Sequence, residues 1–175
     1  EGVITLTSVE GCRVENLQID GNNTTYTSNY NYGIHLASSN NNIVTGNTCN
    51  NNNYGIHLYS SSNNTITGNT CNNNNNIGIY LSTSSNNTIT GNTCNNNHIG
   101  IYLYSSSNNN TVTSNTCNNN INGIRIYSSS NNTITGNTCI RGTGTPGDYT
   151  TDQFTIFLSG TDNNYNLIVA NNCMG

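Results

Sequence analysis

Apolar residues recur at fixed places along the chain, and their spacing predicts a solenoid. The phrase NNTITGNTCNNN at 63–74 returns with small changes at 86, 109 and 131. Aligned on its cysteine, it repeats every 22 or 23 residues, with a longer gap of 34 before the last copy. The cysteines of this column are Cys49, Cys71, Cys94, Cys117, Cys139 and Cys173. A period of about 20 to 50 residues is typical of proteins whose repeats stack on one another.

Each repeat contains three short segments in which apolar and polar residues alternate. Such alternation is typical of β-strands, and it places Ile, Leu and Cys on one face. The first segment has the form Gly-Ile-X-Leu, with the apolar pairs Ile34/Leu36, Ile56/Leu58, Ile79/Leu81, Ile101/Leu103, Ile124/Ile126 and Ile156/Leu158. The second has the form Thr-Ile-Thr and is centred on Val44, Ile66, Ile89, Val112, Ile134 and Ile168. The third is Thr-Cys.

Three strands per repeat, joined by Asn-, Ser- and Gly-rich turns, predict an all-β, single-stranded parallel β-helix. Because connections between parallel strands favour a right-handed path, we expect a right-handed solenoid of about six coils. The whole chain, 1–175, is then one domain. We expect regular coils over about 31–139, an irregular N-terminal coil over 1–30 and a C-terminal coil with an insertion over 140–175.

Two further columns follow from the alignment. Cys12 lies outside the cysteine column, because aligning CRVENLQID with NTITGNTCN places Val14 opposite Ile66 and Ile19 in the cysteine position. The residue two positions before each cysteine of the column is asparagine, and stacked amides can hydrogen-bond between coils. We therefore predict an asparagine ladder of Asn47, Asn69, Asn92, Asn115, Asn137 and Asn171.

The repeat NYGIHLYSSSNNTITGNTCNNN resembles the parallel β-helix repeats of the pectin-lyase-like superfamily. It is most similar to the periplasmic copper-binding branch, which includes accessory proteins of nitrous-oxide reductase and archaeal surface proteins. The resemblance covers about residues 11–139 and implies the fold. That fold hosts lyases, hydrolases, adhesins and structural coats, so the resemblance does not select a function.

The charge pattern argues against catalysis and against nucleic-acid binding. Charged residues are 6% of the chain, lysine is absent and the net charge is −4. No carboxylate side chain lies between residues 21 and 147, so the central coils lack acid–base pairs. The resemblance to the superfamily's lyases implies a catalytic site made of clustered acidic residues and a basic residue. In the central coils the basic residue Arg125 stands alone in its column, without such acids. A catalytic site at the C-terminal end would have to use Asp148, Asp152 and Asp162. We expect no catalytic residue and no cofactor. Because the chain lacks a basic surface, we also expect no nucleic-acid partner.

The cysteine column has a structural and a chemical interpretation. Stacked thiols can hold Cu(I), but alternation points these side chains inward, where cysteine packs as a small apolar residue. We therefore expect a core ladder and no metal. Disulfides between stacked cysteines are disfavoured because their Cβ atoms would lie about 4.8 Å apart. The pairing state of Cys12 stays open.

Aromatic residues gather at the outward positions of the first segment. They are His35, His57, Tyr59, Tyr80, Tyr102, Tyr104 and Tyr127. Stacked rings stiffen a sheet, whereas an exposed aromatic patch is typical of a docking surface. The two hypotheses are therefore a structural ladder and a face that binds carbohydrate or a neighbouring protein.

Threonines form a second outward array, which resembles the ice-binding face of insect antifreeze solenoids. Its members are Thr65, Thr67, Thr88, Thr90, Thr111, Thr113, Thr133 and Thr135. The alternative is that threonine simply suits exposed strands. Beside this array lie Asn-X-Thr sequons, the acceptors of N-glycosylation, at Asn22, Asn23, Asn63, Asn86, Asn109 and Asn131. The alternative is chance, because repeats rich in Asn and Thr generate such sequons freely.

These observations together predict a non-catalytic, extracellular or cell-surface protein with a structural or adhesive role, decorated with glycans. No apolar stretch has the length of a membrane span, so we expect no membrane insertion. The chain opens on EGVITLTSVEG and closes on LIVANNCMG, without a capping helix. Because open coils expose strand edges, we expect either a fragment or copies that associate end to end into a fibre. Ice binding and carbohydrate binding are the alternative functions.

Overall fold

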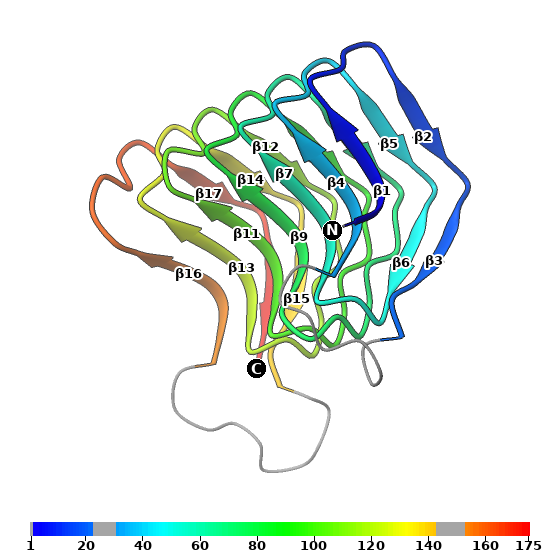
Figure 1. Cartoon of the computed structure of the whole chain (residues 1–175). Coiled ribbons are helices and arrows are strands. Elements are labelled where there is room, and N and C mark those ends of the chain that lie inside the picture. The colour runs from blue at the N-terminus through cyan, green and yellow to red at the C-terminus, as the bar shows by residue number, and fades with distance from the viewer. Residues whose placement is uncertain (1, 23–30, 143–152) are drawn as a thin grey trace.

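A computed structural model of the chain describes residues 2–22, 31–142 and 153–175. Every regular element in these residues is a β-strand, and all strand pairs are parallel. The strands wind into stacked coils that enclose a narrow core (Figure 1). The prediction of an all-β parallel solenoid is therefore confirmed, while the right-handed path stays a prediction. No helix in these residues has the length and apolarity that crossing a membrane requires.

The Gly-Ile-X-Leu segments form one seven-stranded sheet, sheet A. Its order is β1 (Gly2–Thr7), β4 (Tyr32–Ala37), β7 (Tyr54–Tyr59), β9 (Ile77–Ser82), β11 (Ile99–Tyr104), β13 (Asn122–Tyr127) and β16 (Phe154–Ser159). The Thr-Ile-Thr segments form sheet B, in the order β2 (Arg13–Glu15), β5 (Ile43–Thr45), β8 (Thr65–Thr67), β10 (Thr88–Thr90), β12 (Thr111–Thr113), β14 (Thr133–Thr135) and β17 (Leu167–Val169). Seven strands in each sheet give seven coils, where about six were expected.

The Thr-Cys segments form the third side of the coil. Here β3 (Gln18–Asp20) pairs with β6 (Thr48–Asn50), and β15 (Thr138–Ile140) pairs with β18 (Asn172–Met174). Single bridges continue the column between them through Thr48, Thr70, Thr93, Thr116 and Thr138. Ile19 lies opposite Cys49, and Val14 lies opposite Val44, which pairs in turn with Ile66. The sequence alignment of the first coil is therefore confirmed.

The core consists of the inward columns that alternation predicts. The side chains of Ile56, Leu58, Ile66 and Cys71 are all fully buried, and the same positions are fully buried from the coil of β4 to the coil of β13. The five cysteines from Cys49 to Cys139 belong to this cluster, whereas Cys12 and Cys173 are exposed. The core-ladder interpretation of the cysteine column is thus confirmed for those five residues.

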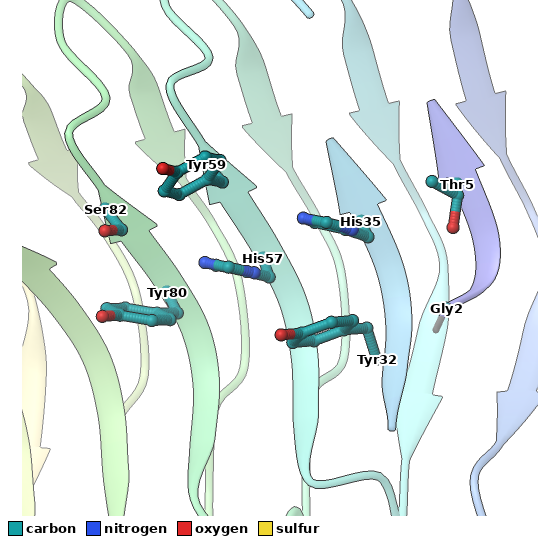
Figure 2. Close-up of a pocket in the computed structure, with 8 residues that line it drawn as sticks. All are labelled: Gly2, Thr5, Tyr32, His35, His57, Tyr59, Tyr80 and Ser82. Atoms are coloured by element: carbon teal, nitrogen blue, oxygen red, sulfur yellow. The ribbon is translucent and has the colours of Figure 1, made fainter. Parts of the chain in front are cut away.

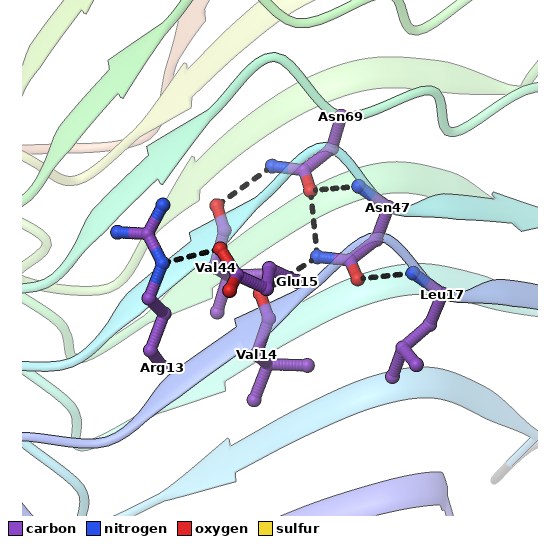
Figure 3. A network of polar contacts seen from close by, with 7 residues as sticks. All are labelled: Arg13, Val14, Glu15, Leu17, Val44, Asn47 and Asn69. Atoms are coloured by element: carbon purple, nitrogen blue, oxygen red, sulfur yellow. Dashed lines mark hydrogen bonds and ion pairs between the residues drawn. The ribbon is translucent and has the colours of Figure 1, made fainter.

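Buried asparagines join the coils at the turns. Figure 3 shows the start of the predicted ladder, where the backbone N–H of Leu17 donates to Oδ1 of Asn47 at 3.1 Å and Nδ2 of Asn47 donates to Oδ1 of Asn69 at 3.0 Å. On the neighbouring β2, Arg13 and Glu15 form an ion pair. The same amide-to-amide bond recurs down the column to Asn171, which confirms the ladder.

A second asparagine ladder, which the sequence analysis missed, runs before sheet B. Its members are Asn42, Asn64, Asn87, Asn110, Asn132 and Asn166. In each step a backbone N–H donates to the Oδ1 of the asparagine in the next coil, over 2.8–2.9 Å. The two ladders satisfy buried backbone groups at both ends of every strand of sheet B, from β5 to β14, and so hold the outer faces in register.

Candidate functional site

The outward side chains of sheet A form a continuous array, which we call the aromatic face. Strand pairing places one column in register, and it runs through His35, His57, Tyr80, Tyr102, Arg125 and Phe157. A second column runs through Tyr59, Ser82, Tyr104 and Tyr127. The structure therefore brings all seven predicted residues of this face together.

The rings of the first column are stacked. His35 and His57 have centroids 4.9 Å apart and planes 3° apart, and Tyr80 continues the stack at 4.7 Å from His57. The guanidinium of Arg125 lies 5.2 Å from the ring centre of Tyr102 and 5.2 Å from that of Phe157. Stacked rings and cation–π contacts are both favourable, so this column stiffens the sheet, as the structural hypothesis holds.

Stacking also buries residues that the sequence analysis placed on an outward column. His57 is 7% exposed because it lies between the rings of His35 and Tyr80, and Tyr102 is 9% exposed because it lies between the ring of Tyr80 and the guanidinium of Arg125. Tyr59, whose opposite residue in the next coil is only Ser82, is 51% exposed. The face therefore has a relief, in which some rings form a floor and others stand up from it.

That relief outlines a shallow, open groove at the N-terminal part of the face (Figure 2). The groove has a volume of about 830 Å³ and is lined by Gly2, Thr5, Tyr32, His35, His57, Tyr59, Tyr80 and Ser82. Figure 2 shows the rings of His35, His57 and Tyr80 side by side, with Tyr59 and Tyr32 on either side of them. This size lies within the range of sites for small ligands.

The side chains that line the groove carry no charge at neutral pH. Burial, and then the charge of His35, lowers the pKa of His57 to about 3. Burial also lowers the pKa of His35, and burial raises the pKa of Tyr80 to about 12. None of the eight lining residues is Asp, Glu, Lys or Arg. The site is therefore suited to an uncharged, amphipathic ligand.

Tyr32 and Tyr54 belong to the aromatic face, although the sequence analysis did not include them. The ring of Tyr32 lies 4.7 Å from that of His35, and the ring of Tyr54 lies 5.7 Å from that of Tyr80. Simple alternation places a residue two before an inward isoleucine on the inward side. The sequence feature that could have revealed the outward position of these tyrosines is the repeated Tyr-Gly-Ile. Its glycine interrupts the alternation and leaves the tyrosine on the outer face.

The predicted threonine face also forms. Thr65, Thr88, Thr111 and Thr133 lie opposite one another on β8, β10, β12 and β14, and the partner column is Thr67, Thr90, Thr113 and Thr135. Thr45 extends the second column onto β5. The two predicted columns therefore lie in register, and ice binding stays a prediction.

The predicted glycosylation sites lie at exposed turns. Asn63, Asn86, Asn109 and Asn131 are all exposed and recur once per coil, and Asn22 is exposed as well. Because neighbouring coils lie only about 4.8 Å apart, glycans on adjacent members of the column would crowd one another. Asn23, like Asp148 and Asp152 of the considered C-terminal site, lies outside the described residues.

Copper, which the sequence resemblance implies, does not fit the residues present. The five thiols from Cys49 to Cys139 are fully buried in the apolar core, and burial disfavours the charged thiolate that a metal binds. The stacked rings of His35 and His57 are parallel, so their in-plane lone pairs run side by side and do not converge on one ion. No group of three or more His, Cys, Asp or Glu suited to a metal occurs in the part of the chain that the structure describes.

Solved structures share the fold at low sequence identity. The periplasmic alginate epimerase AlgG matches with a TM-score of 0.71 and 21% identity, over 95% of this chain and 46% of that one. The A-module of the Azotobacter vinelandii mannuronan C-5 epimerase AlgE4 matches with 0.63 and 14%, over 99% and 55%. The Dettilon tailspike protein matches with 0.64 and 18%, over 93% and 41%. The chain thus spans about half the length of these proteins, and the likeness shows the parallel β-helix fold.

No curated protein sequence matches the chain. A family model does match, and it covers residues 3–170, which is nearly the whole solenoid. Its description is periplasmic copper-binding protein (NosD). The family agrees with the resemblance seen in the repeat, and the chain belongs to the NosD family of periplasmic copper-binding proteins.

Proposed function

We propose that this protein is a non-catalytic structural and adhesive β-solenoid of the cell envelope, which holds carbohydrate on its aromatic face. The observation that carries the proposal is the run of stacked rings from His35 to Tyr102 on sheet A, with a groove of about 830 Å³ along it. Sugar rings have apolar faces rimmed by hydroxyl groups. Tyrosine and histidine match them, because each has a flat apolar body and a polar tip.

The electrostatics of the groove support a role without catalysis. General acid–base catalysis is most efficient when the pKa of the catalytic group lies near the working pH. The pKa of His57, lowered to about 3, and that of Tyr80, raised to about 12, both lie far from neutrality. The related folds include epimerases by name, so an enzyme is the alternative that the experiment must test.

The location outside the cytoplasm is supported by the periplasmic designation of the family. The proposal has three further parts: display at the cell surface, glycosylation at the exposed sequons and end-to-end association of copies. Sedimentation velocity at rising protein concentration would test association, and mass spectrometry of the native protein would test glycosylation.

Affinity electrophoresis through gels containing polysaccharides tests the central proposal. We expect the protein to be retarded by at least one polysaccharide, and Tyr59→Ala to remove the retardation. Tyr165→Ala is the matched control, because Tyr165 is an exposed tyrosine, 88% exposed, that lies outside the face. Unretarded migration in every gel, or new unsaturated or epimerised sugar products after incubation, would overturn the proposal.

Ice binding is the second candidate, because the two threonine columns are in register over four strands. It predicts thermal hysteresis that disappears in Thr90→Tyr and persists in Tyr59→Ala, which alters the other sheet. Freezing without hysteresis in the unmodified protein would eliminate this candidate.

A further inference from the structure

We infer that the groove around His57 is a subsite for one uncharged sugar residue of a polysaccharide that runs along the solenoid axis. This inference rests on the proposed function and names the ligand class and the place where it is recognised. Three features of the groove carry it: unpartnered polar atoms in its floor, ring walls on two sides and the absence of ionic groups.

The floor of the groove contains polar atoms without protein partners. His57 is 7% exposed, and neither its Nδ1 nor its Nε2 makes a hydrogen bond within the described residues. Nε2 of His35, one coil away, is buried and unpaired as well. A buried polar group without a partner is costly. A neutral imidazole offers one donor and one acceptor, and a sugar hydroxyl group can both accept and donate.

The walls of the groove select a flat, amphipathic ligand. The ring of Tyr59 is tilted by 48° to that of His57, with the centroids 6.4 Å apart, and it stands above the floor. Tyr32 lies on the other side, 5.0 Å from His57 between ring centroids. Figure 2 shows His57 between these two tyrosines. A pyranose ring placed there would contact aromatic carbon on its faces and imidazole nitrogen at its edge.

Beyond the groove the floor continues, which favours a polymer over a single sugar. Tyr102 extends the stack 5.4 Å past Tyr80 along the solenoid axis. The next residue, Arg125, is held between two rings, and its guanidinium donates to the hydroxyl of Ser159 at 3.3 Å. Arg125 lies beyond the groove, and none of the eight residues that line the groove is a cation that could pair with the carboxylate of an acidic sugar.

Isothermal titration calorimetry with defined oligosaccharides tests the inference. The probes are neutral hexasaccharides of β-glucan, mannan and xylan, and mannuronate hexasaccharide as the acidic counterpart. We expect at least one neutral probe to bind and the acidic probe not to bind. His57→Phe keeps the stacked ring but removes both nitrogens, and we expect it to bind that neutral probe about tenfold more weakly.

His98→Phe is the matched control, because His98 is exposed in a turn away from the groove. Circular dichroism melting of each variant separates loss of fold from loss of binding. Equal binding of the acidic probe, or unchanged affinity of a folded His57→Phe, would overturn the subsite while leaving the carbohydrate-binding face intact. Failure of every probe with the unmodified protein would overturn both the subsite and the proposed function.

Discussion

Asn69 and Asn92, which lie one coil apart, are joined by a hydrogen bond from Nδ2 of Asn69 to Oδ1 of Asn92 at 3.0 Å. The same oxygen accepts the backbone N–H of Asn69 at 2.9 Å. Nδ2 of Asn92 donates in turn to the carbonyl of Ile66 at 2.9 Å and to Oδ1 of Asn115 at 3.0 Å. One buried amide thus connects three successive coils, which is why each coil acts as a template for the next.

Replacing this amide should be strongly destabilising. In Asn92→Ala the backbone and side-chain donors of Asn69 lose their acceptor, and the carbonyl of Ile66 loses a donor. Each buried group left unpaired costs about 1–3 kcal/mol, so we expect the free energy of unfolding to fall by about 2–4 kcal/mol in urea titrations. Thr88→Ala, an exposed change on the same coil, should cost less than about 1 kcal/mol. Equal losses in the two variants would contradict the ladder's role.

The glycine at the second position of β4, β7, β9, β11 and β13 has a steric function. A Cβ on Gly78 would lie 2.6 Å from the carbonyl oxygen of Gly100 and 3.0 Å from Cβ of Cys94. Because neither the backbone nor the packed core can give way, we expect Gly78→Ala to lower the melting temperature by about 10 °C or more. Gly11→Ala is the control, since its Cβ would meet nothing within 4 Å and only its positive φ of 68° adds strain. A Gly78→Ala variant as stable as Gly11→Ala would show that the coils are more loosely packed.

The coil and its core could be predicted because every repeat presents its apolar residues with one period. Ile66 and Cys71 were placed inward from alternation alone, and both are fully buried. Even the divergent first coil was aligned correctly, since Ile19 takes the cysteine position opposite Cys49. Such inward columns depend only on local alternation and on the stacking of similar residues at equivalent positions of successive coils.

The groove could not be predicted in full, because it depends on contacts between coils. Gly33 interrupts the alternation, so Tyr32 joins His35 on the outer face, contrary to a period-two count. The burial of His57 depends on the rings of His35 and Tyr80, which lie on the neighbouring strands. The sequence of its own strand therefore does not indicate that His57 is buried. The second asparagine ladder was missed for a similar reason, because asparagine in a turn is already explained by local backbone preference.

The thiol column makes a simple prediction about reactivity. Five cysteines are fully buried, whereas Cys12 and Cys173 are exposed. We expect an aromatic disulfide reagent such as Ellman's to label two thiols rapidly in the native protein, and all seven after unfolding in guanidinium. A double variant, Cys12→Ser with Cys173→Ser, should show no rapid labelling. Rapid labelling of that variant would mean that the core opens or that the inward orientation is wrong.

Folding stability should depend on pH through His57. Its pKa is about 3 in the folded protein and about 6.5 when exposed. Between these values the unfolded chain binds the proton and the folded chain does not, so stability is lost as the pH falls below 6.5. At about 1.4 kcal/mol per pH unit, the contribution of His57 between pH 7 and pH 4 is about 3 kcal/mol.

His57→Tyr isolates this effect, because tyrosine occupies the same column at Tyr80 and Tyr102 and does not titrate in this range. Acidic groups elsewhere change the stability of both proteins alike, so the measured quantity is the difference between their urea midpoints at pH 7 and pH 4. We expect the unmodified protein to lose more stability than His57→Tyr as the pH falls. If the stability of the two proteins changed with pH in the same way, His57 would be solvated in the folded state. The conclusion that the floor of the groove is buried and uncharged would then be wrong.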